Sequence, residues 1–406
     1  MKKIITILLI CFTGMTVFAQ DMSYYTEEFF QPDGTFRERR EVLETIRDAK
    51  ITGIGEFYHN ALKLLISRYP DVKTIDDQKD TEESVKIVCS GLVAEKYNAA
   101  VQDLWQLIQF CDVIYENNDG LVMQDVLISI GQLEGKEFVP HIALRLHDFN
   151  TNSISDVETK RRVQRAVVGC INALETLHDI AGFEPIFFAS TGWYDPAIKR
   201  TASVALPNIV EDPGEVIAEI IIDPSNIPSI KYEAWREMLR TRAPDSSKAR
   251  VAAVALATGW NYTTPNMTYQ KNLREMRMSA IDTIRMLGAA DNSVYTNLEK
   301  SYTNNFINNV PDYDEIRKTI NALSALATDD AVNILFGFLR ELNARRRNGP
   351  WSNKERQMLQ WVVPALGSTK TSSMDVKLLL TTIQRSSDYT GAEQRWAADA
   401  IKQLGQ

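Results

Sequence analysis

The stretch that decides the fold is TGAEQRWAADAIKQL, residues 390–404. Thr390 followed three residues later by Glu393 is the pattern of a capping box, which starts an α-helix. The apolar residues then fall at three- and four-residue steps, as on one face of a helix: Ala397, Ala398, Ile401 and Leu404. The stretch is therefore predicted to be one amphipathic helix.

The same pattern recurs along the chain. The arginine of this stretch, Arg395, is the last of five that recur at a fixed period: Arg161, Arg200, Arg317, Arg356 and Arg395. Successive members are separated by 39, 117, 39 and 39 residues, and 117 is three times 39. An apolar pair follows each arginine by five and six residues: Ala166-Val167, Ala205-Leu206, Ala322-Leu323, Trp361-Val362 and Ala400-Ile401. Small alanines at one place in each unit allow neighbouring helices to approach closely. A fixed period of this length indicates stacked repeats.

A second amphipathic helix is predicted in most units, at residues 214–222, 293–306, 331–342 and 373–383. Upstream, three further pairs are predicted: 37–46 with 56–67, 84–92 with 96–110, and 121–130 with 138–146. No alternation of apolar and polar residues persists long enough to predict a sheet. The sequence thus predicts an all-α fold, an α-solenoid superhelix of about nine or ten antiparallel helix pairs with a period near 39 residues.

Capping residues, prolines and glycines agree with the positions of the predicted helices. Ser352 with Glu355 forms a second capping pattern, and Asp195-Pro196 offers an N-cap followed by proline at the first helical position. Four glycines are predicted to end helices: Gly131, Gly288, Gly367 and Gly405. Pro207 should kink or end its helix. Residues 71–83 are predicted to be a polar loop, and 259–270 an irregular stretch.

The first residues differ from the rest. Lys2 and Lys3 precede an apolar run over residues 4–18, and Val17 and Ala19 occupy the small-residue positions before a cleavage site. This predicts a signal peptide at 1–19, a helical cap region at 20–80 and the repeat solenoid at 81–406. We expect an exported protein, periplasmic or secreted, without a membrane span in the mature chain. The run is shorter than the roughly 20 residues that cross a bilayer. A lipoprotein attached through Cys11 is less favoured, because Ile10 before it is bulky.

Composition excludes some functions. A net charge of −8 without a basic tail disfavours nucleic-acid binding, which needs a surplus of Lys and Arg. Three cysteines follow the predicted cleavage site at irregular spacing, which fits no disulfide framework or zinc motif: Cys89, Cys111 and Cys170. Each lies in an apolar helical context, so we expect small buried side chains.

Catalytic and metal-binding patterns are weak. The histidines are few and do not form HExxH: His59, His141, His147 and His178. GxSxG, GxxxxGK[ST] and GxGxxG are also missing from the sequence. We therefore expect a non-catalytic protein without a cofactor or metal. Two alternatives stay open: a hydrolase acting on the envelope or cell wall and built on a helical scaffold, and a purely structural envelope component.

The predicted helix pairs repeat about every 39 residues, with Asp195-Pro196 ahead of Arg200 and an Ala-Leu step within the first helix. In these features the chain resembles the HEAT-repeat family, in an exported form. An armadillo-like solenoid is the related alternative. The resemblance implies a scaffold that binds a protein partner. It also implies that the periodic arginines pair with an aspartate of an adjacent repeat, for which Asp195 and Asp314 are the candidates.

The resemblance further implies that the second helices line the inner, binding face. The candidate binding residues are the polar positions of three such helices: His141, Arg145, Tyr295, Glu299, Tyr302 and Arg340. Tyr295, Glu299 and Tyr302 are spaced i, i+4 and i+7, on one helix face. The alternative is that these are only the solvated sides of amphipathic helices. Arg345, Arg346 and Arg347 either offset a helix C-terminus or contact an acidic partner.

Overall fold

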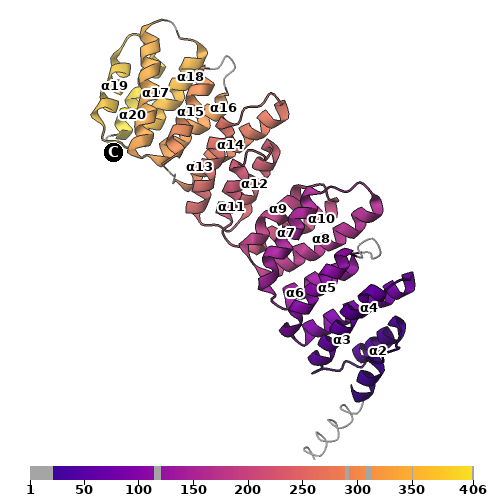
Figure 1. Cartoon of the computed structure of the whole chain (residues 1–406). Helices are drawn as coiled ribbons and strands as arrows, with labels where there is room; N and C mark the ends of the chain where they lie inside the picture. The colour runs from indigo at the N-terminus through magenta and orange to yellow at the C-terminus, as the bar shows by residue number, and fades with distance from the viewer. Residues whose placement is uncertain (1–21, 114–119, 289–291, 308–311, 350, 405–406) are drawn as a thin grey trace, which may run out of the picture. The chain divides into compact units, whose positions relative to one another are not determined.

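The computed structural model describes residues 22–113, 120–288, 292–307, 312–349 and 351–404. Helices account for the regular structure of these residues, and no strand occurs among them (Figure 1). The predicted all-α fold is therefore confirmed. The chain divides into two compact units, with unit 1 ending at Val210 and unit 2 beginning at Glu211.

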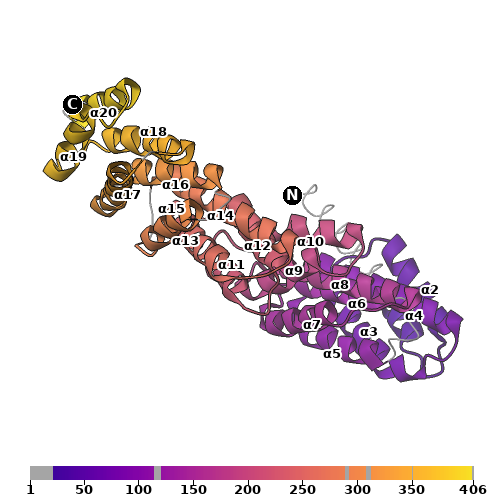
Figure 2. The ribbon, with the colours of Figure 1, turned by 90° about the horizontal axis from the view of Figure 1, so that it is seen from above.

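Unit 1 contains helices that pack in neighbouring pairs and form two layers: α2 (Phe36–Asp48), α3 (Gly55–Arg68), α4 (Ile75–Ala94), α5 (Val101–Val113), α6 (Leu121–Gln132), α7 (Val139–Thr151), α8 (Val157–Leu177), α9 (Phe183–Thr191) and α10 (Pro196–Ile209). The even-numbered helices each contact the next even-numbered helix, and we call them the even layer. The odd-numbered helices form the odd layer (Figure 2).

Unit 2 repeats this arrangement with α11 (Gly214–Ile222), α12 (Pro228–Arg240), α13 (Asp245–Asn261), α14 (Met267–Leu287), α15 (Val294–Ile307), α16 (Tyr313–Leu326), α17 (Asp329–Arg347), α18 (Asn353–Ser368), α19 (Met374–Arg385) and α20 (Gly391–Leu404). Its odd layer runs from α11 to α19 and its even layer from α12 to α20. The four second helices predicted here correspond to α11, α15, α17 and α19.

The core lies between the two layers. The alanines that repeat in the sequence are all buried there, as close approach of the helices requires: Ala166, Ala205, Ala322 and Ala400. The largest buried side chains, Trp235, Phe183 and Phe187 among them, fill wider gaps. Periodic apolar faces thus explain why each helix packs on its neighbours.

Capping patterns mark the helix starts correctly. Ser352 with Glu355 opens α18, and the backbone N–H of Thr390 donates to Glu393 at 2.7 Å to open α20. The predicted polar loop over residues 71–83 is wrong, because α4 begins at Ile75. Thr74 and Asp77 form a capping box there, and acidic residues in a first turn favour the helix.

The predicted helix ends are partly wrong. Gly288 does end α14 in the left-handed conformation, with φ 59°. Gly131 and Gly367 instead lie inside α6 and α18, where neighbouring helices cross. A Cβ on Gly131 would lie 2.9 Å from Cα of Ala173, so the glycine permits close packing rather than a stop. Gly405 lies outside the described residues.

Two breaks are milder than predicted. α10 continues past Pro207 and ends at Ile209. Between α13 and α14 only residues 262–266 are irregular. The predicted signal peptide at 1–19 lies outside the described residues, and the division at residue 80 stays a prediction. Among the helices that are described, none is both long and apolar enough to cross a membrane.

Candidate functional site

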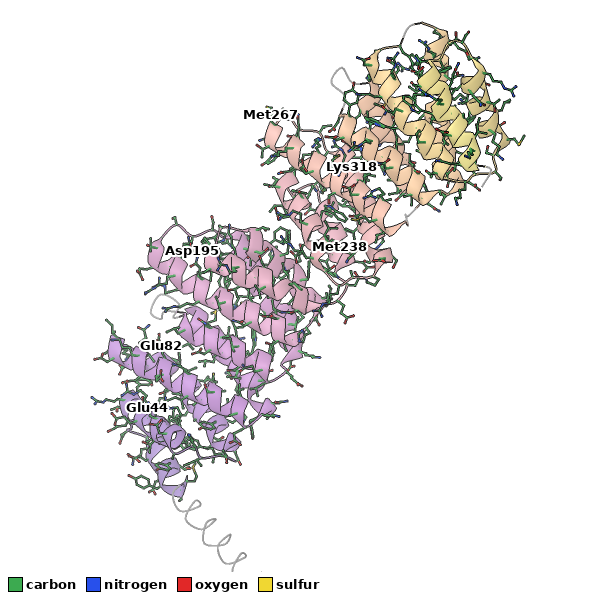
Figure 3. All side chains as sticks on the ribbon, turned by 180° about the vertical axis from the view of Figure 1, so that it is seen from behind. Glu44, Glu82, Asp195, Met238, Met267 and Lys318 are labelled. Atoms are coloured by element: carbon green, nitrogen blue, oxygen red, sulfur yellow. The ribbon has the colours of Figure 1, made fainter. Side chains whose placement is uncertain are left out.

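Ion pairs join consecutive helices of the even layer. Arg277 on α14 bonds Glu315 on α16 through Nε–Oε1 at 2.8 Å and Nη2–Oε2 at 3.0 Å. Further pairs repeat this link between consecutive even helices: Arg40–Asp80, Arg47–Glu83, Lys160–Asp195, Arg274–Asp312, Lys318–Asp282 and Arg356–Glu393. Asp195 is the N-cap residue of α10 (Figure 3). These pairs hold consecutive even helices together.

These pairs differ from the expected ladder of arginines. Asp195 accepts from Lys160, and Asp312 rather than Asp314 accepts from the preceding even helix, α14. Asp312 is the N-cap of α16, whereas Asp314 is its second helical residue and is exposed. Arg356, one of the periodic arginines, does bond the next even helix, with Nε 3.2 Å from Oε1 of Glu393.

The candidate residues of unit 1 lie on α7 in the odd layer. His141 is exposed, and its ring centroid is 5.5 Å from that of Trp105, which stacks on Phe138 at 5.0 Å. Arg145 is half-buried one turn further along. Leu144 beside them is 61% exposed, so this face presents an apolar side chain among polar ones.

The candidate residues of unit 2 lie on α15 and α17, also in the odd layer. The structure brings Glu299 and Arg340 together at a groove of about 570 Å³ between these two helices. The groove is lined from both helices by Glu299, Thr303, Asn333, Ile334, Gly337, Phe338, Arg340, Glu341 and Ala344. Two of the four predicted residues thus share one concave surface.

Tyr302 was predicted to be available for binding, and this is wrong. Its side chain is fully buried, stacked on Phe338 with ring centroids 3.5 Å apart and on Phe306 at 5.5 Å. Burial raises the pKa of its hydroxyl. The helical spacing did place Tyr302 on the face that includes Glu299, but that part of the face is covered by α17.

Tyr295 has a local partner. Its hydroxyl lies 2.8 Å from Oγ1 of Thr328, the N-cap residue of α17, and its side chain is half-buried. It lies outside the groove lining. Its contact joins α15 to the start of α17 and so helps to fix the two helices that form the groove.

The groove carries opposite charges. The guanidinium of Arg345 holds Glu341 by Nη2–Oε1 at 2.8 Å and Nε–Oε1 at 3.1 Å, so that carboxylate is occupied. Glu299 and Arg340 are exposed and make no ion pair within the described part of the chain. The floor between them includes Phe338, which is almost fully buried.

The arginine run at the end of α17 has a structural use. Nε of Arg346 donates to the carbonyl of Asp388 at 2.6 Å, and the guanidinium lies 5.5 Å from the Trp351 ring centroid and 6.0 Å from that of Tyr389. Arg345 covers the Phe306 ring at 4.6 Å. Arg346 thus ties α17 to the turn before α20, and Arg345 packs on α15, so both arginines have contacts within the fold.

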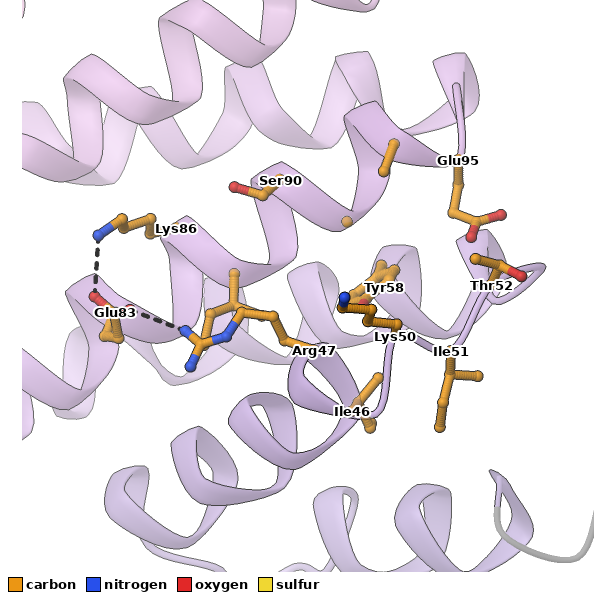
Figure 4. Close-up of a pocket in the computed structure, with 13 residues that line it drawn as sticks. Ile46, Arg47, Lys50, Ile51, Thr52, Tyr58, Glu83, Lys86, Ser90 and Glu95 are labelled. Carbon is orange, nitrogen blue, oxygen red and sulfur yellow. Dashed lines mark hydrogen bonds and ion pairs between the residues drawn. The ribbon is translucent and has the colours of Figure 1, made fainter. Parts of the chain in front are cut away.

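A second concavity of about 380 Å³ lies between α2, α3 and α4. Figure 4 shows Glu83 between Arg47 and Lys86, at 3.4 and 3.5 Å, with Tyr58 and Lys50 near the centre. Sequence reasoning missed this pocket, because its lining comes from three segments and no short motif marks it. Two of its cations, Arg47 and Lys86, share the Glu83 carboxylate.

Neither histidines nor acidic residues form a metal centre in the ranges that the structure describes. His59 bonds Asp103 between α3 and α5, with Nε2 2.6 Å from Oδ2. Neither the comparison with family models nor the search of curated proteins finds a match for this chain.

Proposed function

We propose that this chain is a non-catalytic scaffold that binds a protein partner through its odd layer. In this proposal the fold is a HEAT-like or armadillo-like α-solenoid, a superhelix with a period near 39 residues. The protein is exported after removal of residues 1–19. Determining the N-terminal residue of the mature protein tests export, with Gln20 expected and an intact Met1 contradicting it.

The spacing of the cross-helix pairs supports the repeat. Partners of consecutive even helices are separated by 35 residues for Lys160 and Asp195, 38 for Arg277 and Glu315, and 40 for Arg40 and Asp80. Separations near the proposed period are expected where each unit contacts its neighbour in the same way. This spacing supports the proposed repeat.

The observation that carries the function is the pair of charged side chains at the α15–α17 groove. Glu299 and Arg340 face one concave surface without an ion pair among the described residues. Exposed charges are not required for the fold, and they give an interface its orientation and specificity. Two such charges at one groove favour binding there.

The chemistry of the groove favours a protein over a polyanion. Its rim has both signs of charge and its floor is apolar, with Phe338 and Ile334 between the charged positions. An apolar centre with a polar rim is the usual anatomy of a protein interface. A net charge of −8 opposes nucleic acid.

The test uses a double variant, Glu299→Ala with Arg340→Ala, and a matched control in the even layer of the same unit, Asp314→Ala with Arg317→Ala. All four side chains are exposed and make no ion pair within the described residues, so both variants should fold with wild-type thermal stability. We expect a partner that is captured by the wild type and by the control to be lost from the groove variant.

Equal capture by both double variants would remove the α15–α17 groove as the binding surface. Loss of capture by the even-layer control alone would place the binding surface on the even layer, which contradicts the proposal. Thermal unfolding of each variant shows whether a lost partner reflects the surface rather than the fold.

A further inference from the structure

Gly337 lies in the middle of α17 and differs from the other glycines that lie beyond the first residue of a described helix. A Cβ on each of those others would lie under 3.0 Å from a neighbouring element, so packing excludes a side chain: Gly91, Gly131, Gly169, Gly259 and Gly367. A Cβ on Gly337 would meet nothing within 4 Å. Packing within the described residues therefore does not explain this glycine.

A glycine at that position weakens the helix. It increases the conformational freedom lost on folding and leaves the helix backbone open to water. Gly337 is partly exposed and has ordinary helical geometry, so no left-handed turn requires it either. Neither packing nor a left-handed backbone requires this glycine. The remaining physical reason is the close approach of a molecule outside the chain.

The open space at Gly337 belongs to the α15–α17 groove. Ile334 and Phe338 border it on α17, and Thr303 faces it from α15. Tyr302 stacks beneath Phe338, which makes this floor rigid. Arg340 follows Gly337 by three residues and therefore lies on the same side of the helix. The bare backbone thus lies between an apolar floor and an unpaired cation.

We propose that this groove receives an extended protein segment, whose main chain lies against Gly337 and whose acidic side chain pairs with Arg340. The inference rests on the proposed scaffold function and names the kind of segment that is bound. A main chain needs the clearance that a side chain at residue 337 would remove. Glu299 on the opposite helix then selects a basic side chain on the same segment, and the two charges fix its direction.

The experiment selects binders from a displayed library of random linear peptides, with the full chain as the target. Peptides enriched on the wild type are measured against Gly337→Leu, which fills the groove, and Arg340→Glu, which reverses its cation. The matched controls make the same changes elsewhere in unit 2. Gly391→Leu alters a helical glycine that also has open space, and Arg317→Glu alters an exposed arginine of the even layer.

We expect enriched peptides to contain an acidic residue next to a small one, together with a basic residue. Both groove variants should weaken their binding by about tenfold or more while the controls do not. A library that gives no enriched peptide, or peptides that bind Gly337→Leu as well as Gly391→Leu, would overturn the inference. If partner capture still depends on Glu299 and Arg340 in that case, the scaffold function stands and only the peptide-like occupant is wrong. If capture is independent of them as well, both proposals fail.

Discussion

Arg277 and Glu315 form a two-point ion pair between consecutive even-layer helices, and the carboxylate is fully buried. The guanidinium also lies 4.1 Å from the Trp260 ring centroid and donates to the carbonyl of Gly259 at 2.9 Å. One arginine of α14 therefore contacts both α13 and α16. Arg277 thus links the odd and even layers of unit 2.

Removing one partner of this pair should destabilise the protein. Arg277→Met leaves the Glu315 carboxylate buried without its cation, and the expected loss is about 3–5 kcal/mol of unfolding free energy. Urea unfolding followed by circular dichroism measures it. The double variant Arg277→Met with Glu315→Met should recover most of the loss, because no charge is then buried alone. A single variant as stable as wild type would show that the pair is dispensable.

Two glycine-to-alanine changes should act in opposite directions. Gly169→Ala places a Cβ 2.9 Å from Cα of Gln124, and we expect a loss of about 1–3 kcal/mol despite the better helix former. Gly337→Ala has open space and should gain up to about 1 kcal/mol. Thermal unfolding of both variants tests the distinction. A destabilised Gly337→Ala would mean that this glycine has a role in the fold.

The pairing of Asp312 predicts a loss of stability in acid. Burial alone would raise the pKa of Asp312, but hydrogen bonds from Arg274 and from the backbone N–H of Glu315 outweigh it and hold that pKa below the ordinary 3.8. A carboxylate with a depressed pKa stabilises the fold above its unfolded value and loses this contribution as pH falls through its folded pKa. The contribution should therefore disappear below about pH 4.

Urea midpoints measured from neutral pH to strong acid test this dependence. Asp312→Asn should be less stable than wild type at neutral pH and lose less stability on acidification. Asp314→Asn is the control, because Asp314 is exposed and makes no ion pair in the described ranges. Parallel curves for wild type and Asp312→Asn would contradict the role of this ion pair.

The thiols of Cys89 and Cys170 should react slowly in the native protein. Both side chains are buried in the structure, and a thiol must reach solvent as its thiolate to react. Alkylation in native buffer and in urea, read by peptide mass spectrometry, should modify both residues quickly only after unfolding. A disulfide between them, or rapid native alkylation, would contradict their placement. The side chain of Cys111 lies outside the described residues.

Helical periodicity and capping chemistry predicted many of the helices, but no range was predicted for α9 or α12. The range 214–222 coincides with α11, and Ser352 with Glu355 marks the start of α18, because these signals are local. The prediction of a loop at 71–83 is wrong because charged residues do not exclude a helix. Thr74 with Asp77 forms the same kind of capping box as Ser352 with Glu355.

Contacts between helices were harder to predict. The period pointed to Asp314, but the N-cap Asp312 faces the preceding helix, a difference of two residues that depends on how α14 and α16 pack. Tyr302 shares a helical face with Glu299, yet α17 covers it. Gly337 gave no signal at all, since its meaning depends on what surrounds it in space. The contacts between helices and the groove could therefore be found only in the structure, whereas most helices could be predicted from the sequence.

The central claim, that a protein partner binds the odd layer at the α15–α17 groove, is tested most directly by site-specific photo-crosslinking in cells that produce the protein. A photoreactive residue replaces the exposed Asn333 in the groove or, as the matched control, the exposed Arg317 in the even layer of the same unit. We predict a discrete crosslinked protein at position 333 that disappears when Arg340→Glu is added, and no such product at position 317. Equal crosslinking at both positions, or none at position 333, would contradict the account.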